Sequence, residues 1–561
     1  MDISIIIPVY NVEEEYLRAC LNSVLDQNVR NYEVIIADDG STDNSGAIVD
    51  EYAAKHPEFK VLHLKNGGPG RARNIALSHA KGKYITFLDS DDLLAPGILE
   101  KMLLRAEHDK SDVTICNVSR FNSRNTWDSY NHRRVFRDLD SLTDVRKSPS
   151  LLYDTVSSNK LIRRSLWEKY DIRYPEDILY EDIPVMTEVY LRARRVSVIR
   201  TVGYMWRVRD GETSSTTQRR REFRNLQDRL TALRMLDRLF DETGADRDLC
   251  LEKQLKALKL DLKMYINLCS DQDREEAEQY AEAIRGYIRE SISDEAIEAL
   301  NPADQEIYRA LIAKDIDRLK KLVAFRKERY PGIPLTEKDS RLLMKVDRAL
   351  FNEDYIDVTM SARFRFPVLQ IKTVKLTEDE RIKIVAYMYF PMINMPDTNY
   401  QTVRAYLYDE YTGEETALKV EKRLNKWMEE EDCTVTDELT GETISYTYKG
   451  TAFNVYLDPV KILKPHKEAV ILLRYENRFT SGTTLLKNTA RLTEKEKESL
   501  SKGKAKKAIE KKEQKIADKI ANASLTVDGI SVVPEVGSDD VIRVRIEGHS
   551  LKQRMKGFFT R

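Results

Sequence analysis

The chain carries the run Ile3–Val9 (ISIIIPV) near its start, a stretch of almost uninterrupted β-branched residues. Such a run is typical of a strand that is buried on both faces of a parallel sheet. The next segment, Glu14–Asp26, repeats its apolar residues at helical spacing, so that one face holds Leu17, Cys20, Leu21 and Val24. A buried strand followed by an amphipathic helix is the first half of a βαβ unit.

The same alternation continues beyond this first unit. Further strands are predicted at Tyr32–Ala37, Lys60–Leu64, Tyr84–Leu88 and Val113–Asn117, with helices at Ser45–His56 and Gly70–Ala80. Strands separated by such helices indicate right-handed crossovers and a mostly parallel sheet, which binds ligands at the carboxyl ends of its strands. Three of these ends carry polar residues, and we expect a site where they converge: Pro8–Asn11, Asp38–Thr42 and Asp89–Asp92.

The length of 561 residues exceeds what one hydrophobic core supports, and we predict three domains. Residues 1–220 would form the α/β domain, and residues 221–352 a linker domain that is helical up to about Leu350. Residues 353–561 would form the C-terminal region, in which the stretch from about Phe364 to Asn488 alternates strands and turns without crossover helices and predicts an antiparallel, immunoglobulin-like β-sandwich. This region also contains a Lys-rich helix over Glu494–Asn522, expected to be solvated, and we expect the region to mediate oligomerisation.

Composition narrows the class of protein. Charged residues make up 33% of the chain but the formal net charge is −1, so no overall field favours nucleic acid or a membrane surface. The apolar runs fall far short of the roughly 20 residues of a membrane-spanning helix, and the first residues lack the features of a signal peptide. The five cysteines are scattered without C-x-x-C spacing, which argues for a reducing compartment. We therefore expect a cytoplasmic protein.

The first motif with chemical content is F-L-D-S-D-D, residues 87–92, where three carboxylates follow a buried strand. Clustered carboxylates repel one another, so a cation is expected nearby, and hard oxygen ligands suit Mg²⁺ or Mn²⁺. Asp89 and Asp91 would point to the same side of an extended segment, one toward a ribose or a metal-bound water and the other toward the metal. The alternative is a turn in which Asp92 caps the helix after Pro96.

Two further motifs follow predicted strands. In A-D-D-G-S-T-D, residues 37–43, Asp39 is placed to accept hydrogen bonds from a nucleobase or ribose, and Ser41 or Thr42 to cap the next helix. In N-G-G-P-G-R-A-R-N, residues 66–74, the glycines permit a phosphate to approach a helix N-terminus, and Arg71 and Arg73 add positive charge. Each motif taken alone is also what a turn and a helix start require.

The last two motifs are L-Y-E-D-I-P, residues 179–184, and Y-M-W-R-V-R, residues 204–209. The adjacent acids Glu181 and Asp182 precede a predicted helix, so they are either a pair favoured by the helix dipole or the site of a general base. Arg207 and Arg209 alternate on a predicted strand, where they would neutralise a departing diphosphate or simply face solvent.

These motifs, preceded by P-V-Y-N at residues 8–11, resemble in their order the family 2 glycosyltransferases with the GT-A fold. The resemblance implies an inverting transfer of a sugar from a nucleotide-diphospho-sugar, with Mn²⁺ or Mg²⁺ as cofactor. The residues that it implies for the base, usually uracil, and for the rest of the nucleotide are Pro8, Tyr10, Asp39, Asn66, Gly68 and Arg73.

The resemblance also implies roles for the remaining candidates. Asp89 would bind the ribose or a metal-bound water, and Asp91 would hold the metal on the diphosphate. Asp182 would be the catalytic base, with Glu181 beside it on donor or acceptor hydroxyls. The phosphates would be clamped by Arg207 and Arg209.

A closer resemblance is to the poly(ribitol-phosphate) β-N-acetylglucosaminyltransferases of wall teichoic acid. The shared features are G-G-P-G, Y-D-I-R-Y-P-E (residues 170–176), A-K-D-I-D-R (residues 313–318) and the domain layout. It implies a UDP-N-acetylhexosamine donor, a polyol-phosphate acceptor and a homo-oligomer, a trimer in that family. Those relatives carry a histidine after the final arginine, and Asp210–Ser214 has none, which leaves the third metal ligand open.

Other readings remain beside this one. An enzyme of capsular or exopolysaccharide synthesis would use another donor sugar, and a catalytically weak oligomeric scaffold would need none of the carboxylates that are present. A nucleotidyltransferase would need a basic, glycine-rich loop where Val9–Glu13 is acidic and lacks glycine. The basic tail Leu551–Arg561 would place the protein peripherally at the inner face of an anionic membrane.

Overall fold

The computed structural model describes residues 1–209, 221–329, 332–359, 366–426, 434–437, 440–441, 443–459, 461–462, 468–489, 502–527, 530–537 and 539–547. The chain divides into two compact units, residues 1–300 with 311–316, and residues 301–310 with 317–561. This boundary lies inside the stretch predicted as a helical linker domain, and the division into three domains remains a prediction.

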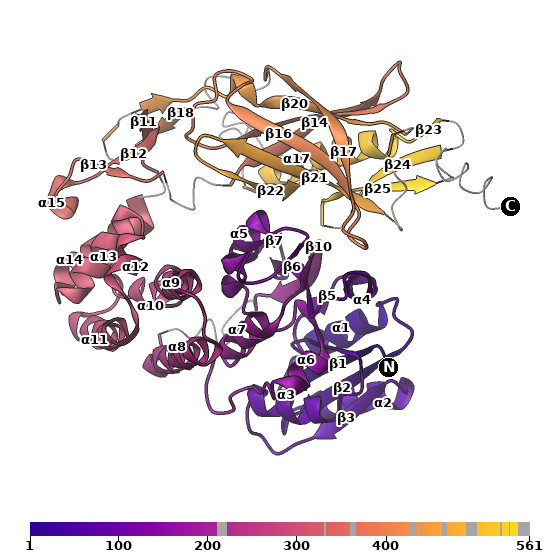
Figure 1. The fold of residues 1–561 in the computed structure, drawn as a ribbon, viewed down its shortest axis with the longest axis vertical. Helices are drawn as coiled ribbons and strands as arrows, with labels where there is room; N and C mark the ends of the chain where they lie inside the picture. Colours follow the sequence, from indigo (N-terminus) through magenta and orange to yellow (C-terminus); the bar gives the residue numbers. More distant parts are fainter. Residues whose placement is uncertain are drawn as a thin grey trace. The chain divides into compact units, whose positions relative to one another are not determined.

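A mixed sheet forms the centre of the first unit (Figure 1), in the order β3-β2-β1-β4-β9-β6-β10-β5. Its strands are β1 Ile3–Val9, β2 Tyr32–Asp38, β3 Phe59–His63, β4 Tyr84–Phe87, β5 Leu93–Leu94, β6 Val113–Phe121, β7 Thr126–Asp128, β8 Leu142–Thr143, β9 Lys160–Arg163 and β10 Val196–Arg207. β1 pairs in parallel with β2 and β4, which confirms the predicted crossovers. β9, which sequence reasoning missed, runs antiparallel between β4 and β6.

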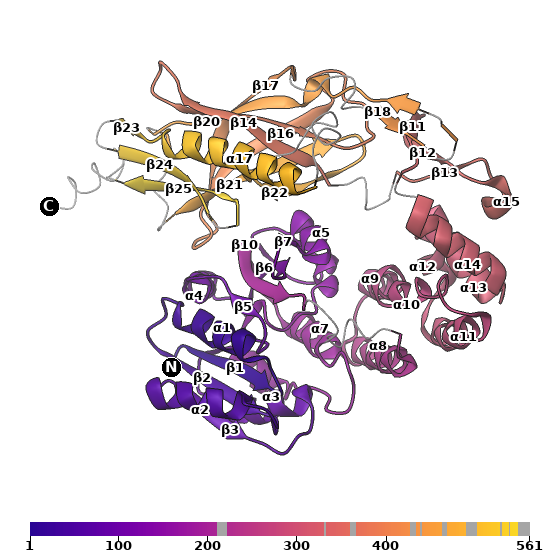
Figure 2. The same ribbon diagram turned by 180° about the vertical axis from the view of Figure 1, so that it is seen from behind.

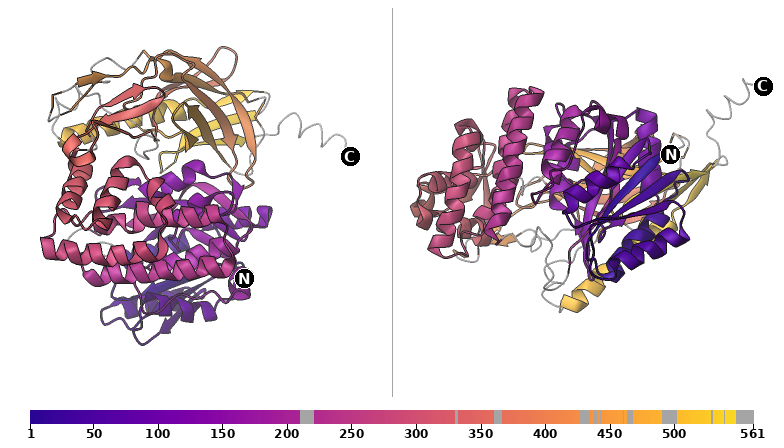
Figure 3. Two further views of the ribbon diagram at one scale, coloured as in Figure 1. Left: turned by 60° about the vertical axis from the view of Figure 1, so that its left-hand side comes forward. Right: turned by 90° about the horizontal axis from the view of Figure 1, so that it is seen from below.

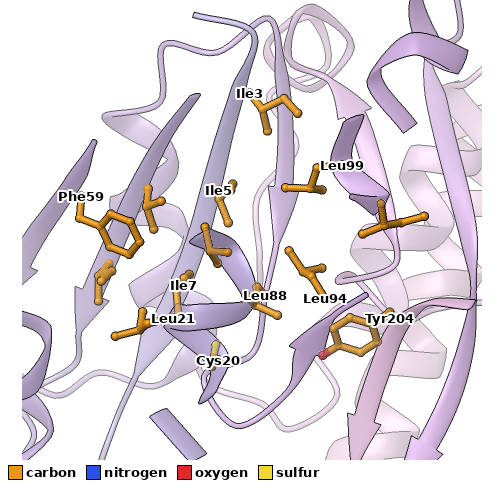
Figure 4. Packing of buried hydrophobic residues seen from close by; sticks show 14 of the residues in the cluster. Ile3, Ile5, Ile7, Cys20, Leu21, Phe59, Leu88, Leu94, Leu99 and Tyr204 are labelled. Carbon is orange, nitrogen blue, oxygen red and sulfur yellow. The ribbon is translucent and has the colours of Figure 1, made fainter. Parts of the chain in front are cut away.

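Helices cover both faces of this sheet. They are α1 Glu14–Leu25, α2 Ser45–Lys55, α3 Pro69–Ser78, α4 Ile98–Asp109, α5 Tyr130–Asp138, α6 Arg164–Lys169 and α7 Asp182–Arg192. Ile3, Ile5 and Ile7 alternate along β1 and pack with Leu21 of α1 and Leu99 of α4 (Figure 4). Because side chains alternate across a strand, this apolar run buries both faces of the strand that ends at the site.

The remaining helices of the first unit follow residue 220. They are α8 Phe223–Thr243, α9 Arg247–Lys256, α10 Lys263–Ile266, α11 Arg274–Ser291 and α12 Asp294–Glu298. α8 packs against α7 and against α11, and these long helices appear in magenta and pink in the left view of Figure 3. The helix that carries Asp182 is thus supported by a helix from the segment after residue 220.

The second unit is mainly antiparallel β-structure, as predicted. Its elements include α13 Pro302–Ile312, α14 Ile316–Ala324, β11 Leu335–Lys338, β12 Arg341–Lys345, α15 Arg348–Phe351, β13 Tyr355–Asp357, β14 Val368–Leu376, β15 Ile382–Tyr389, β16 Gln401–Tyr408, β17 Glu415–Arg423, β18 Thr434–Thr436, β19 Thr443–Ser445, β20 Ala452–Leu457, β21 Ala469–Asn477, β22 Ser481–Leu485, α17 Lys502–Ala521, β23 Leu525–Val527, β24 Ile530–Val536 and β25 Ile542–Glu547. Its largest sheet has ten strands, in the order β14-β15-β20-β17-β16-β21-β25-β24-β23 with β22 paired to β21.

Two expectations for this unit are wrong. The helical pattern does not continue to Leu350, because β11 and β12 form a hairpin whose turn residues Asp339 and Ser340 take φ angles of 51° and 61°. Paired positive φ angles are what a two-residue hairpin turn requires. The Lys-rich helix is also not fully solvated: α17 packs against β14 and β24 (Figure 2), and its Ile520 is buried. The tail Leu551–Arg561 lies outside the described residues.

Within the described part of the chain, no helix combines the length and the apolar character that crossing a bilayer demands.

Candidate active site

The predicted nucleotide side of the site lies at the carboxyl ends of β1 and β2. Pro8 is paired in register with Ala37, so the two strands end side by side. Tyr10, directly after β1, is 50% exposed, whereas Asp39, directly after β2, is buried. The strand order reverses between β1 and β4, which is the switch point where sheets of this type bind ligands.

Asp39 holds the glycine-rich loop in place. Its carboxylate accepts hydrogen bonds from the backbone amides of Gly67 at 2.9 Å and Gly68 at 2.8 Å. Asn66 donates through its side-chain amide to the backbone carbonyl of Asp39. Burial raises the pKa of Asp39 even though these two amides lower it. Gly68 has a φ of 87°, a conformation that favours glycine, and it leads directly into α3.

The turn after β2 does not cap α2 in the predicted way. The N-cap residue of α2 is Asn44, and its side chain makes no capping bond. The backbone amide of Ser41 donates instead to Asp38, and that of Thr42 donates to the side chain of Asn11 after β1. The first bond closes the turn after β2 and the second ties the two strand ends together, so the polar turn residues shape the site rather than the helix.

Arg73 of α3 connects the strand end at residue 89 with the acidic pair before α7. Its guanidinium donates to Asp89 at 2.7 Å and to Glu181 at 2.5 Å, and it lies over the ring of Tyr174. The Arg73 side chain is only 8% exposed. The structure thus brings together carboxylates that lie about 90 positions apart in the sequence, as the motifs predicted.

The segment Asp89–Asp92 is a turn and not an extended segment. The amide of Asp92 donates to the carbonyl of Asp89, and Asp89 and Asp91 therefore reach different cations. Asp92 does not cap the following helix, whose N-cap residue is Gly97. Its buried carboxylate accepts from the Tyr204 hydroxyl and from the backbone amide of Arg207. Burial and the charges of Asp91 and Asp89 raise the pKa of Asp92 well above its ordinary value.

Both predicted phosphate-binding arginines contact Asp91. Arg209 donates through Nε and Nη2 to the same carboxylate oxygen, Oδ2, at 2.9 and 2.7 Å. Arg207 donates to the backbone carbonyl of Asp91, and its guanidinium lies 4.2 Å from the ring centroid of Tyr16 and 4.5 Å from that of Phe121. A guanidinium held between two rings and a carbonyl is fixed in place, so Arg207 is not a solvated surface residue.

Asp182 is the first residue of α7 and stands beside this network. Among the described residues, no hydrogen bond or ion pair engages its carboxylate. Burial and the neighbouring charge of Glu181 raise the pKa of Asp182 to about 7, against the lowering effects of Arg229 and Arg73. A carboxylate that titrates near neutral pH is suited to accept a proton under physiological conditions.

Sequence reasoning missed several groups that build the site. Tyr204 lies inside the quoted Y-M-W-R-V-R motif, but spacing gave no reason to connect its hydroxyl with Asp92. Tyr16 and Phe121 are apolar partners of Arg207 from distant elements. Arg229 lies outside every motif, and its effect on Asp182 appears only when α8 is in place.

The described residues contain no cluster of three or more His, Cys, Asp and Glu side chains arranged to hold a metal ion. The predicted metal ligand Asp91 nevertheless has one carboxylate oxygen free, because Arg209 takes only Oδ2 and no described residue donates to Oδ1. The stretch Asp210–Ser214, where a histidine ligand was sought, lies outside the described residues.

A sheet with this strand order, with carboxylates at its switch point and arginines facing them, is typical of α/β domains with the GT-A fold. The family profile described as Glycosyl transferase family 2 matches residues 4–171. Residues 4–171 thus match a family 2 glycosyltransferase domain, as the motifs suggested.

The chain is similar to several bacterial glycosyltransferases. It is 34% identical over 221 residues to the putative glycosyltransferase EpsH of Bacillus subtilis, covering 39% of this chain and 63% of that protein. It is 34% identical over 221 residues to the poly(ribitol-phosphate) beta-glucosyltransferase of Bacillus spizizenii, covering 38% of this chain and 34% of that protein. The poly(ribitol-phosphate) beta-N-acetylglucosaminyltransferase TarS of Staphylococcus aureus is 32% identical, with 38% and 37% covered. The matches thus span only about one third to two thirds of these relatives.

Among solved structures, S. aureus TarS 1–349 in complex with UDP-GlcNAc is 25% identical, with a TM-score of 0.48 and coverage of 64% of this chain and 99% of that chain. The structure titled S. aureus TarS covers 98% of this chain and 86% of that chain, at 18% identity and a TM-score of 0.48.

Proposed function

We propose that this chain is an inverting glycosyltransferase that moves a sugar, N-acetylhexosamine in the first place, from a UDP-sugar to a hydroxyl of a polyol-phosphate polymer such as teichoic acid. The observation that carries the proposal is the convergence around Arg73, which bonds Asp89 and Glu181 while the unbonded Asp182 carboxylate lies next to them. Poly(ribitol-phosphate) glycosyltransferases among the relatives support the choice of acceptor.

Each residue has a defined part in this reaction. Tyr10, with Pro8 beneath it, would lie on the base, and Asp39 would present the glycine loop at Asn66 and Gly68 to the nucleotide. Asp182 would take the proton of the acceptor hydroxyl. At the same time the acceptor oxygen would attack the anomeric carbon, and the bond from that carbon to the nucleoside diphosphate would break. Arg207 and Arg209 would stabilise the charge that develops on the leaving phosphate.

A divalent cation fits beside Asp91. The free Oδ1 is a hard oxygen ligand, and a single carboxylate completed by substrate phosphates is the usual way in which proteins hold Mg²⁺. When bound, Mn²⁺ or Mg²⁺ would neutralise the diphosphate. Asp91→Asn should therefore raise the metal concentration needed for half-maximal transfer at least tenfold, with little change for the exposed control Asp177→Asn, measured by nucleoside diphosphate release against Mn²⁺ concentration.

We place this activity in the cytoplasm, because Cys20, Cys116, Cys250 and Cys269 are free thiols, as expected in a reducing compartment. Trimerisation through the C-terminal region and membrane contact through the tail Leu551–Arg561 complete the proposal. Light scattering and liposome flotation of the full chain, with and without residues 551–561, test these two points.

The decisive experiment is a donor and acceptor screen of the purified chain. UDP-, GDP- and CDP-sugars are offered with Mn²⁺, together with poly(ribitol phosphate) or a capsular polysaccharide fragment, and nucleoside diphosphate release is recorded. We expect UDP-N-acetylhexosamine and poly(ribitol phosphate) to give the highest rate. Asp182→Asn should abolish transfer and retain UDP binding, whereas Asp177→Asn, an exposed acid five positions earlier, should behave as wild type. Turnover by Asp182→Asn would remove the assigned base, and a preference for the capsular fragment would favour an exopolysaccharide enzyme.

A further inference from the structure

The segment that leads into the catalytic base is held by one helix from outside the α/β sheet. Asp228 of α8 accepts a hydrogen bond from the backbone amide of Leu179 at 3.2 Å. Asn225, three residues earlier on α8, accepts one from the Tyr180 hydroxyl at 2.6 Å. Both contacts fall within three residues of Asp182, and both come from the first turns of α8.

Arg229, the next residue on α8, completes this contact. Its guanidinium carbon lies 3.6 Å from the centroid of the Tyr180 ring. The side chain is 8% exposed and forms an ion pair with the fully buried Asp261 at 2.9 Å. Asp261 also lies 3.0 Å from the ammonium group of Lys256. Arg229 is thus a fixed cation that covers one face of the residue two positions before the base.

Tyr180 itself has an unfavourable backbone conformation. Its φ is +66°, in the left-handed region, which is strained for a residue with a side chain. Such a conformation persists only where the surroundings over-determine it. The ring contact with Arg229, the hydroxyl bond to Asn225 and the neighbouring amide bond to Asp228 supply that restraint.

We infer that Asn225, Asp228 and Arg229 are positioning residues for the proposed glycosyl transfer, which hold the Leu179–Asp182 segment in its strained turn and place a permanent positive charge beside the base. The inference rests on the proposed function, since it concerns the same carboxylate. It assigns to α8, a helix beyond the matched family 2 region, a direct influence on catalysis.

The charged groups that face Asp182 come from every element packed around it. Burial, Glu181 and Asp89, which follows β4, raise the pKa of Asp182. The two arginines Arg229 of α8 and Arg73 of α3 lower it. Lys160 of β9, itself buried, also interacts electrostatically with Asp182. A general base works in its ionised form, so the rate falls as pH drops through this pKa. Removing the charge of Arg229 therefore raises the pKa of Asp182 and moves the acidic limb of the rate profile to higher pH.

The test is the pH dependence of kcat/KM for the full chain with UDP-N-acetylhexosamine and poly(ribitol phosphate), from pH 5 to pH 9.5. Arg229→Met should move the acidic limb upward by about one pH unit, so that kcat/KM is about fivefold lower at pH 7 and recovers at pH 9.5. Lysine at the same position keeps the positive charge, so Arg229→Lys should show the same acidic limb of kcat/KM as the wild type. Arg285→Met is the matched control, since Arg285 is a buried arginine paired with a carboxylate, Glu282, on α11.

A second variant leaves the buried ion pairs intact. Tyr180→Leu removes the ring under Arg229 and the hydroxyl on Asn225 but keeps Arg229 and Asp261, so the fold should tolerate it. Because the turn is then held less firmly, kcat should fall about tenfold, while the Kd for UDP, set at Asp39 and the glycine loop, stays unchanged.

The outcomes distinguish a failure of the positioning role from a failure of the proposed function. If the wild-type limb is present and Asp182→Asn abolishes transfer, but Arg229→Met leaves the limb in place and Tyr180→Leu leaves kcat unchanged, the positioning role is wrong and the proposed function stands. A loss of rate in Arg229→Met without any shift of the acidic limb would also overturn it, since the base would then titrate as it does beside the guanidinium. If the wild type shows no transfer, or Asp182→Asn is active, the proposed function itself fails.

Discussion

Arg73→Met removes the cation on which the site converges, and its effect can be worked out from the contacts of Arg73. Breaking a buried ion pair by removing one partner costs about 3–5 kcal/mol. Asp89 is 37% exposed and is partly screened by water, whereas Glu181 is only 12% exposed. We therefore expect a loss near the lower end, about 3 kcal/mol at pH 8.

The loss should depend on pH in a definite direction. Without Arg73, the pKa of Asp182 rises further above its unfolded value of about 3.9, because Arg73 lowers it in the wild type. A carboxyl group whose folded pKa is raised contributes stability that is fully present below the unfolded pKa and is lost as pH rises through the folded pKa. The variant should thus recover about half of its deficit at pH 5, where the crowded carboxylates can bind protons.

Hydrogen exchange of the amides in β1 and β4 is the suitable measurement, because it reports the opening free energy of this unit within the full chain. Arg71→Met is the matched control: Arg71 lies two positions away, is half-buried, and its guanidinium donates to the backbone carbonyl of Lys65 and to no carboxylate among the described residues. It should change the opening free energy by less than about 0.5 kcal/mol. An equal loss at pH 5 and pH 8, or an equal loss in both variants, would refute the electrostatic argument.

Three further changes probe other parts of the site. Asp39→Ala leaves the amides of Gly67 and Gly68 without their acceptor, so UDP affinity measured by titration calorimetry should fall about tenfold, whereas Asp43→Ala should leave it unchanged. Tyr204→Phe removes a donor to the buried Asp92 and should lower the opening free energy of β10 by about 1–3 kcal/mol, measured by hydrogen exchange. Asp154→Asn leaves the buried Lys160 without its carboxylate and should cost about 3–5 kcal/mol at pH 7. This loss of stability should be smaller at pH 9.5, because burial lowers the pKa of Lys160 and the neutral amine is favoured there. Thermal unfolding at both pH values checks this.

The parts of the fold that rest on local pattern could be read from the sequence. β1 and β2 are uninterrupted apolar runs, and their parallel pairing follows from the helices between them. Strand β9 was not predicted, because it has only four residues, Lys160–Arg163, with a charge at each end. The β11–β12 hairpin was not predicted, because its turn residues, Asp339 and Ser340, include no glycine or asparagine. Only their positive φ angles mark the turn.

The candidate site was predictable to the extent that strand ends must meet. Asp39 and Asp89 follow strands whose ends the βαβ pattern brings to one edge of the sheet, whereas the acidic pair before α7 was assigned to the site by the family resemblance. The partners of these residues were not predictable, because a contact such as Arg229 with Tyr180 joins positions 49 apart through packing that spacing does not encode. For the same reason, the alternative role considered for Asp92, a helix cap, is wrong, and the residue instead anchors β10 through Tyr204 and Arg207.

The distribution of cations explains why one carboxylate of the site suits proton transfer and the others suit binding. Glu181 and Asp89 share Arg73, and Asp91 is held by Arg209, so each of these acids already faces a guanidinium that a proton would have to displace. Asp182 has the same crowded, acidic surroundings but no bonded cation, and its pKa rises to about 7. Neighbouring carboxylates of one site that differ in their bonded cations therefore have different pKa values and suit different roles. A guanidinium moved from Asp89 and Glu181 to Asp182 would reverse that assignment, which is why the restraint on the Leu179–Asp182 turn, where Glu181 and not Asp182 bonds Arg73, matters as much as the acids themselves.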